Sequence, residues 1–358
     1  MSWLYSDAIR DLVNNNILPG IADQVSDINT LMKLLMNDGS TKPIRGNTPR
    51  TKAGFLVGGD KIERPIDMAE LTARGWYRGY SPLKSTQNRT TDTVTQPFAG
   101  AYATVMISFD EEDKAKGDAA RINLVKYKIG KVYQALKAQI GPALYYYDGQ
   151  LTGDNIFAPN GIGQLLGTRV SGTVYGGINR SWMGIDSTTA GNEYWDANMI
   201  DENSADADLL DPTSSDHIFK ILSRLEVACQ HNNKTLTHIL TTPYLWEIYE
   251  EALRQKQVIN SAKEADLGFQ MLHFRGIPVI REMSSSIPDY AIYGMNLSDI
   301  DGDGPGIKVY GAEGRFFKLE PWRRVEGQAA FVADLFVKFA IYSDSPRYHG
   351  SAQGVGAT

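Results

Sequence analysis

Residues 101–140 read AYATVMISFDEEDKAKGDAARINLVKYKIGKVYQALKAQI, a strand pattern that runs into a long helix pattern. Residues 101–109 are rich in β-branched and aromatic side chains and predict a strand. A helix from about Asp113 to Ile140 would be about 40 Å long. We expect Gly141-Pro142 to break or kink it, and the lysines at 126, 128, 131 and 137 to lie mainly off its apolar stripe. That stripe recurs every three or four residues, as a buried helix face does: Ile122, Val125, Ile129, Val132, Leu136 and Ile140.

The stretch before this strand is long, polar and locally basic. Residues 74–102 read RGWYRGYSPLKSTQNRTTDTVTQPFAGAY. Such a segment has too little apolar content to fold alone, so we expect it to lie along another surface. Its basic residues (Arg74, Arg78, Lys84 and Arg89) are interleaved with aromatic ones (Trp76, Tyr77 and Tyr80).

Three interpretations of this basic and aromatic stretch are open. Cations and rings together form the grooves that bind single-stranded nucleic acid. The stretch could also be a hairpin with a solvated charged face. Finally, Arg, Tyr and Trp are the residue types enriched at protein–protein hot spots, which favours a contact arm.

The composition limits the function classes. The formal net charge of the 358 residues is −6, which weighs against a dedicated nucleic-acid binder. The single cysteine, Cys229, excludes an intrachain disulfide framework. We find no secretory signal pattern and no apolar run near the ~20 residues that cross a bilayer. We therefore expect a protein made in a reducing, soluble compartment.

The rest of the chain predicts mixed helices and strands. Residues 21–35 carry a helical stripe, residues 40–60 read as an extended arm, and residues 153–216 form a loop-rich region with many acids. The pattern then alternates: a helix over 216–231, a strand over 237–241, and a helix starting with Thr242 as N-cap and Pro243 as first residue. Short strands follow at 269–274, 277–281 and 289–295, and a long strand closes the chain at 330–342.

No constellation of residues predicts an active site, a cofactor site or a strong metal site. Cys229 and His231 are two apart on a helix and face different sides, so Cys229 reads as a core residue. The five histidines show no paired metal spacing. Asp299, Asp301 and Asp303 match the first half of a calcium loop, but Tyr310 stands where the closing Glu belongs. A turn between strands is the favoured reading there, with a weak cation site as the alternative.

The order of these parts resembles the major capsid protein of tailed bacteriophages, the Hong-Kong-ninety-seven-like shell fold that encapsulins share. Three local segments support the resemblance. Val174–Trp182 (VYGGINRSW) is similar to a "G-G-I-D-R-S" segment common in these proteins, with Asn179 in place of the acid. Residues 239–249 (ILTTPYLWEIY) resemble a strand-into-helix step, and residues 274–280 (FRGIPVI) resemble an "F-x-G-x-P-V" strand.

The resemblance implies an α+β capsid fold that is structural and not enzymatic, with no cofactor. It divides the chain into an N-terminal arm (1–55), an extended β E-loop (56–105), a peripheral domain with a long spine helix (106–149), an α/β axial domain (150–305), return strands of the peripheral domain (306–345) and a C-terminal tail (346–358). The basic and aromatic stretch then lies in the E-loop and contacts a neighbouring subunit.

The implied partners are further copies of the chain in hexamers and pentamers, with scaffold, portal and decoration proteins as further candidates and packaged double-stranded DNA bound without sequence specificity. The implied location is the virion capsid, after assembly in the host cytoplasm. Two alternatives stay open: an encapsulin-like shell around a cargo protein, and a nucleic-acid-binding module.

Overall fold

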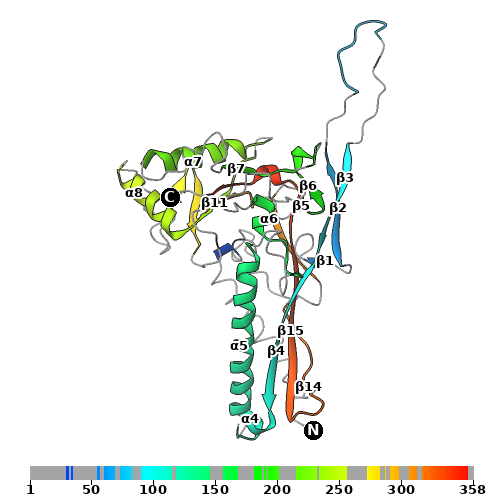
Figure 1. Ribbon diagram of the computed structural model, residues 1–358, viewed down its shortest axis with the longest axis vertical. Helices are drawn as coiled ribbons and strands as arrows, with labels where there is room; N and C mark the ends of the chain where they lie inside the picture. Colours follow the sequence, from blue (N-terminus) through cyan, green and yellow to red (C-terminus); the bar gives the residue numbers. More distant parts are fainter. Residues whose placement is uncertain are drawn as a thin grey trace.

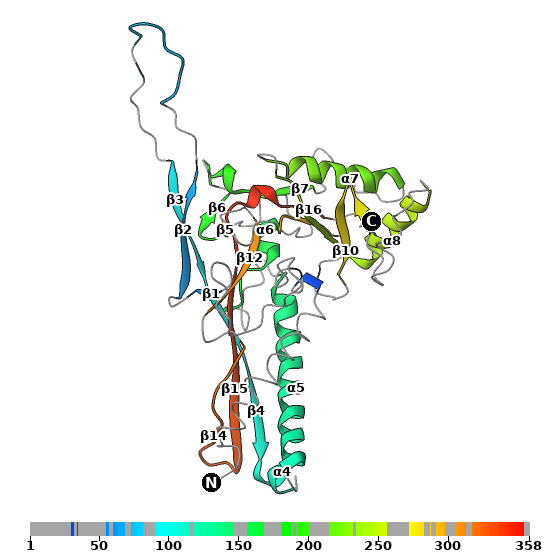
Figure 2. The same ribbon diagram turned by 180° about the vertical axis from the view of Figure 1, so that it is seen from behind.

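The computed structural model places a long two-layer lobe, a helix-covered sheet and a projecting hairpin around a common centre (Figure 1). The figure's opposite view shows the same arrangement (Figure 2). The structure describes residues 30–31, 34, 55–56, 60–68, 73–81, 83, 90–114, 118–145, 156–167, 181–187, 189–190, 192–200, 215–231, 234–255, 272–282, 287, 291–297, 306–312 and 317–353.

The long lobe is organised around β15 (Ala330–Ser343). One edge of β15 pairs antiparallel with β4 (Ala99–Ser108) over ten residues, with Leu335 opposite Ala103. Its other edge pairs in succession with β14 (Arg323–Arg324), β13 (Lys318–Leu319) and β12 (Ile307–Ala312). The short β1 (Phe55–Leu56) pairs parallel with β12 and completes the six-stranded sheet.

Helix α5 (Asp118–Ala143) packs along β4 and covers one face of the β4–β15 ribbon. Five of the six predicted stripe residues are buried, and Ile122 is half-buried. Alternate residues of β4 (Val105 and Ile107) are buried toward the helix side, while Tyr102 and Met106 are exposed on the other face. The predicted strand and helix therefore form one stiff unit.

The boundaries of this unit differ from the prediction. The strand ends at Ser108, because Ser108 and Glu111 form a reciprocal capping box: the Glu111 N–H donates to Ser108 Oγ, and the Ser108 N–H donates to the Glu111 carboxylate, both at 3.2 Å. A separate helix α4 (Phe109–Lys114) starts there. At the other end α5 continues through Pro142 to Ala143, because Leu144 N–H still bonds Ile140 C=O at 3.1 Å.

The second sheet carries its own hydrophobic cluster under two helices. Its six strands run in the order β7 (Asn198–Ile200), β16 (Gly350–Gln353), β11 (Ala291–Met295), β8 (His238–Thr241), β10 (Ile277–Arg281) and β9 (Leu272–Phe274). The covering helices are α7 (Ser215–Ala228) and α8 (Pro243–Gln255). Thr242 Oγ1 accepts the Leu245 N–H at 3.5 Å, which agrees with the predicted N-cap.

Smaller elements connect the sheets. They are the buried helix α6 (Ile162–Leu166), the hairpin of β5 (Ser181–Trp182) and β6 (Ile185–Asp186), and the 3₁₀ turns η5 (Glu193–Trp195) and η7 (Pro346–Tyr348). Of the predicted helix over residues 21–35, the structure describes Thr30, Leu31 and Leu34, all helical. The remaining residues of the predicted arm to residue 54 lie outside the described residues.

Candidate assembly surface

The hairpin of β2 (Lys61–Asp67) and β3 (Thr91–Pro97) carries the basic and aromatic stretch on its connecting segment. Ile62, Ile66 and Val94 are buried in the larger hydrophobic cluster. The Thr95 N–H donates to the Met183 carbonyl at 3.0 Å, which joins β3 to the β5–β6 turn. The base of the hairpin is therefore fixed to the body.

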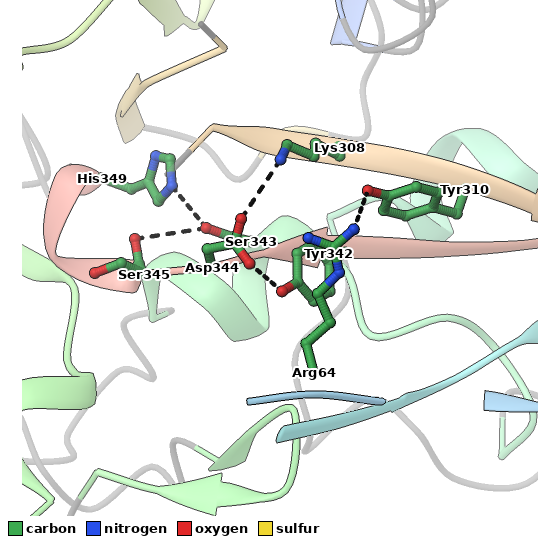
Figure 3. A network of polar contacts seen from close by, with 8 residues as sticks. All are labelled: Arg64, Lys308, Tyr310, Tyr342, Ser343, Asp344, Ser345 and His349. Atoms are coloured by element: carbon green, nitrogen blue, oxygen red, sulfur yellow. Dashed lines mark hydrogen bonds and ion pairs between the residues drawn. The ribbon is translucent and has the colours of Figure 1, made fainter. Parts of the chain in front are cut away.

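Arg64 fastens β2 to the strands of the long lobe (Figure 3). Its Nη2 donates to the hydroxyl of Tyr310 on β12 at 3.5 Å. Its guanidinium also lies 5.5 Å from the ring centroid of Tyr342 on β15, within the range of a cation–π contact. These contacts link the direction of the hairpin to the register of β12 and β15.

Behind Arg64 lies an ion pair between a buried lysine and a half-buried aspartate (Figure 3). Lys308 Nζ, on a side chain only 2% exposed, is 3.4 Å from the Asp344 carboxylate. The Tyr342 hydroxyl donates to the same carboxylate. Burial raises the pKa of Tyr342 far above its ordinary range, and the Asp344 carboxylate raises it further. The hydroxyl therefore stays protonated and remains a donor.

Buried His349 takes part in a set of hydrogen bonds next to this ion pair. The Asn296 N–H donates to Nδ1 of His349 at 3.1 Å, so the neutral ring carries its proton on Nε2. That nitrogen donates to Ser343 Oγ at 3.0 Å, and Ser343 Oγ donates to the Ser345 carbonyl at 3.5 Å. The network thus joins β15 to the strand β16 that enters the second sheet.

Large aromatic side chains at the end of the hairpin segment lie in solvent. Trp76 is 105% exposed and Tyr80 is 107% exposed relative to an isolated residue, and Tyr77 and Leu83 are also exposed. Residues 78–81 form a turn in which Ser81 N–H and Oγ both donate to the Arg78 carbonyl, with Gly79 at φ 59°. Figures 1 and 2 show residues 73–81 at the opposite end of the molecule from α4.

The predicted contact residues fall into two groups. Arg74, Trp76, Tyr77, Arg78 and Tyr80 lie together on this exposed segment. Lys84 and Arg89 lie outside the described residues. We call residues 73–81 and 83 the hairpin tip. Four large apolar side chains of the tip are therefore exposed in the single subunit: Trp76, Tyr77, Tyr80 and Leu83.

Comparison with solved structures decides the fold. A capsid subunit of cyanophage A-1(L) matches 88% of this chain and 97% of its own, with a TM-score of 0.58 at 15% identity. The capsid of a native GTA particle matches 88% and 93%, with a TM-score of 0.51 at 12% identity. The capsid of Myoviridae phage XM1 matches 84% and 90%, with a TM-score of 0.50 at 10% identity.

The chain has the phage capsid fold. No protein-family model matches it, and no curated protein sequence does. The capsid fold that the order of sequence elements resembles is therefore confirmed by structure, although identities of 10–15% show the fold alone.

A second exposed surface of this capsid fold lies on the β4–β15 ribbon, on the face away from α5. Tyr102, Met106 and Phe336 are exposed there, and the rings of Tyr102 and Phe336 are 6.4 Å apart. Asp334 on the same face accepts hydrogen bonds from Thr104 Oγ1 at 2.7 Å and from Arg323 Nη2 at 2.6 Å. This ribbon face is apolar in part and fixed by the strand register.

Other candidate chemistry finds no support among the described residues. Burial raises the pKa of the Cys229 thiol to about 12, so it is a thiol at neutral pH. No group of three His, Cys, Asp or Glu able to hold a metal occurs in the described ranges. Asp299, Asp301 and Asp303 lie outside them. No described helix combines the length and apolarity needed to cross a membrane.

Sequence reasoning missed two features that position the ribbon face and the hairpin. The Ser108–Glu111 capping box could have been predicted from the S-x-x-E pattern at the start of the helix. Arg64 carried no such signal, because Tyr310 and Tyr342 are more than two hundred residues away and meet it only in the folded chain.

Proposed function

We propose that the chain is a major capsid protein, a structural subunit of an icosahedral shell built from hexamers and pentamers around double-stranded DNA. The observation that carries the proposal is the fully exposed hairpin tip, mounted on a body with the fold of three phage-type capsids. A shell subunit must bind identical copies through heterologous patches, and an aromatic tip that a free subunit leaves in solvent suits that need.

The tip corresponds in this proposal to the E-loop. Arg74, Trp76, Tyr77, Arg78 and Tyr80 would contact the next subunit, together with Lys84 and Arg89. The long lobe with α5 as spine serves as the peripheral domain, and the helix-covered sheet serves as the axial domain. The segment 1–55 acts as an arm. The predicted C-terminal tail of residues 346–358 needs a correction, because Gly350–Gln353 form the buried strand β16 between β7 and β11 and therefore belong to the axial sheet.

The fixed base of the hairpin supports this role. Side chains that must reach a neighbour act best when their mount is rigid, because less ordering free energy is then lost on binding. Arg64 on β2 and the ion pair of buried Lys308 with Asp344 provide such a mount. The proposed protein is structural and not an enzyme, works in the virion capsid and assembles in the host cytoplasm.

Expression of the full chain, followed by sedimentation and electron microscopy, tests the proposal. Closed shells that contain DNA support it, and scaffold, portal or decoration proteins would copurify with such particles. Shells that contain a cargo protein instead would establish the encapsulin-like alternative. A stable, enzymatically active monomer that forms no shell, with or without crowding agents, contradicts the proposal.

A further inference from the structure

Helices α7 and α8 cover opposite halves of the second sheet. Helix α7 packs on β7 and β16, whereas α8 packs on β10. Figure 1 shows α7 along the top of this lobe and α8 at its left edge. Within the subunit the two helices touch through the rings of Phe219 and Tyr249, whose centroids are 5.6 Å apart. Each helix therefore keeps a further side that faces away from both the sheet and its neighbour.

The outward side of α7 is a narrow basic stripe. Its exposed side chains, among those that the structure describes, are Lys220, Arg224 and Val227. At 100° per residue these three positions fall within about 60° of one another. The buried residues Ile218 and Leu222 lie on the opposite side of the helix. We call Lys220, Arg224 and Val227 the α7 stripe.

The outward side of α8 is a narrow stripe of the opposite charge. After Pro243, which starts the helix, the exposed described side chains are Tyr244, Glu247 and Glu251. These positions also fall within about 60° of one another, at 100° per residue. Buried Tyr249 lies on the opposite side. We call Tyr244, Glu247 and Glu251 the α8 stripe.

The two stripes have the same spacing when one of them is read backward. From Lys220 onward, the members of the α7 stripe are four and then three residues apart, about 6 Å and about 4.5 Å along the helix axis. From Glu251 backward, the members of the α8 stripe are also four and then three residues apart. An antiparallel pair of these helices would therefore place each cation beside a carboxylate and the two apolar side chains together.

The subunit does not match these side chains internally. Within the described residues, Lys220, Glu247 and Glu251 form no ion pair. Glu226, which lies on the side of α7 and outside the stripe, is 2.9 Å from Arg275. The apolar member is 61% exposed in the α7 stripe and 50% exposed in the α8 stripe. A partner that carries the complementary stripe would pair the charges and cover the apolar side chains in one contact.

We infer that the α7 stripe of one copy packs antiparallel against the α8 stripe of the next copy. The inference rests on the proposed function and specifies one contact between the copies. The predicted pairs are Lys220 with Glu251, Arg224 with Glu247, and Val227 with Tyr244.

The charges of the two stripes also determine the kind of assembly. The contact joins two different patches from opposite halves of one sheet, so it is heterologous and passes from copy to copy until a ring closes. A contact of either stripe with its own kind would bring like charges together, which is strongly unfavourable. The stripes therefore favour a ring of copies over a twofold dimer through this surface.

Reversal of the charges tests the inference in the full chain. Lys220→Glu with Arg224→Glu gives a chain with two acidic stripes, and Glu247→Lys with Glu251→Lys gives a chain with two basic stripes. Each variant alone should need a protein concentration about tenfold or more above that of the wild type to assemble, because like charges then meet at every contact. Sedimentation over a concentration series measures this threshold.

An equimolar mixture of the two variants is the matched control for folding. The mixture should assemble near the wild-type concentration, because each acidic stripe then meets a basic one, whereas misfolded chains would not rescue each other. A mixture that assembles no better than its components overturns the inference. Assembly of either variant alone at the wild-type concentration also overturns it.

Disulfide cross-linking tests the same contact without a closed shell. A chain with Val227→Cys is mixed with a chain with Tyr244→Cys, oxidised and analysed by non-reducing electrophoresis. The covalent dimer should form several-fold more in this mixture than in either chain alone. The control replaces the second chain with one carrying Tyr127→Cys, a position on α5 that is 62% exposed. A mixture that cross-links no better than this control overturns the inference.

Sedimentation of the same proteins reports separately whether shells form. Cross-linking of Val227→Cys to Tyr244→Cys without any shell would support the contact and contradict the proposed function. Shells that form without this cross-link would support the proposed function and overturn the inference.

Discussion

The Tyr145 hydroxyl donates a hydrogen bond to the buried Glu282 carboxylate at 2.8 Å, and this carboxylate joins three distant segments. It also accepts the backbone N–H groups of Leu31 at 3.0 Å and Thr30 at 3.3 Å. Tyr145 follows the end of α5, and Glu282 follows the end of β10. Burial, and then the Glu282 charge, raise the pKa of Tyr145 well above its ordinary value. The helical segment at Thr30 is thus attached to the body by one anion.

Glu282→Gln should lower the free energy of unfolding by about 1–3 kcal/mol, because a neutral amide accepts these bonds less well and adds an unmatched donor. Tyr145→Phe should cost about 1 kcal/mol, and the double variant should cost less than the sum. Urea denaturation of all four proteins gives the coupling. Simple additivity of the two changes would show that the Tyr145–Glu282 contact contributes nothing.

Asp344→Asn should destabilise the chain more than Lys308→Met. The first change removes the carboxylate beside an ammonium whose side chain is 2% exposed, whereas the second removes the buried charge itself. We expect a loss of about 3 kcal/mol for Asp344→Asn, and clearly less for Lys308→Met. Thermal unfolding of the free subunit ranks the two. A larger loss for Lys308→Met would contradict our reading of the pair.

Trp76→Ala combined with Tyr80→Ala should abolish assembly while the free energy of unfolding changes by no more than about 0.5 kcal/mol, because both side chains are fully exposed in the subunit. A buried aromatic anchor contributes about 2 kcal/mol, roughly 30-fold in each contact. Light scattering during assembly measures the effect, with Trp76→Phe as the conservative control. Normal assembly by the double alanine variant would exclude the tip as a contact.

The Glu111 contribution to stability should disappear in acid. Its hydrogen bonds to Lys128 and then to the Ser108 backbone lower the pKa of the carboxyl below its ordinary value of 4.5. A lowered pKa in the folded state means that the stabilisation is present above about pH 4.5 and is lost as the pH falls through the lowered value. The stability difference between wild type and Glu111→Gln, from urea denaturation, should be clear at pH 7 and absent near pH 2. A stability difference between the two proteins that grows in acid would contradict this prediction.

Gly350→Ala should cost about 1–3 kcal/mol, because a Cβ built there would lie 2.7 Å from the Asn198 carbonyl and 2.8 Å from Cys229 Sγ. Gly100→Ala, also on a strand, is the matched control, since nothing lies within 4 Å of its Cβ position. Chemical denaturation separates the two. Equal stabilities would show that β16 and α7 accommodate the methyl group by moving.

The elements that sequence predicts well are those that local periodicity determines. The stripe from Val125 to Ile140 and the long strand β15 follow from apolar spacing, and Thr242-Pro243 starts α8 where caps predict it. The predicted closing strand at 330–342 is not the last one, because β16 follows it. Boundaries were less predictable, because the Ser108–Glu111 box and the continuation past Pro142 depend on single hydrogen bonds. Composition predicted that the stretch around the hairpin tip has no core of its own, but it did not predict the contacts that hold the base of the hairpin.

The contacts that hold the base of the hairpin and the helical segment at Thr30 were not predicted, because the residues that make them are distant in sequence. Arg64 meets Tyr310 and Tyr342, and Glu282 meets Leu31, only after the strands have paired. Spacing rules apply within one segment of the chain, so they do not predict contacts between distant segments. The proposed role of the tip in assembly also depends on a second copy of the chain, which the fold of one subunit does not include.

A reconstruction of the assembled particle at side-chain resolution is the most direct test of the proposed function. We predict a closed shell in which Trp76, Tyr77 and Tyr80 of each copy are buried against the next copy, although they are exposed in the single subunit. A shell that leaves these three side chains in solvent, or a full chain that forms no shell, would contradict the account.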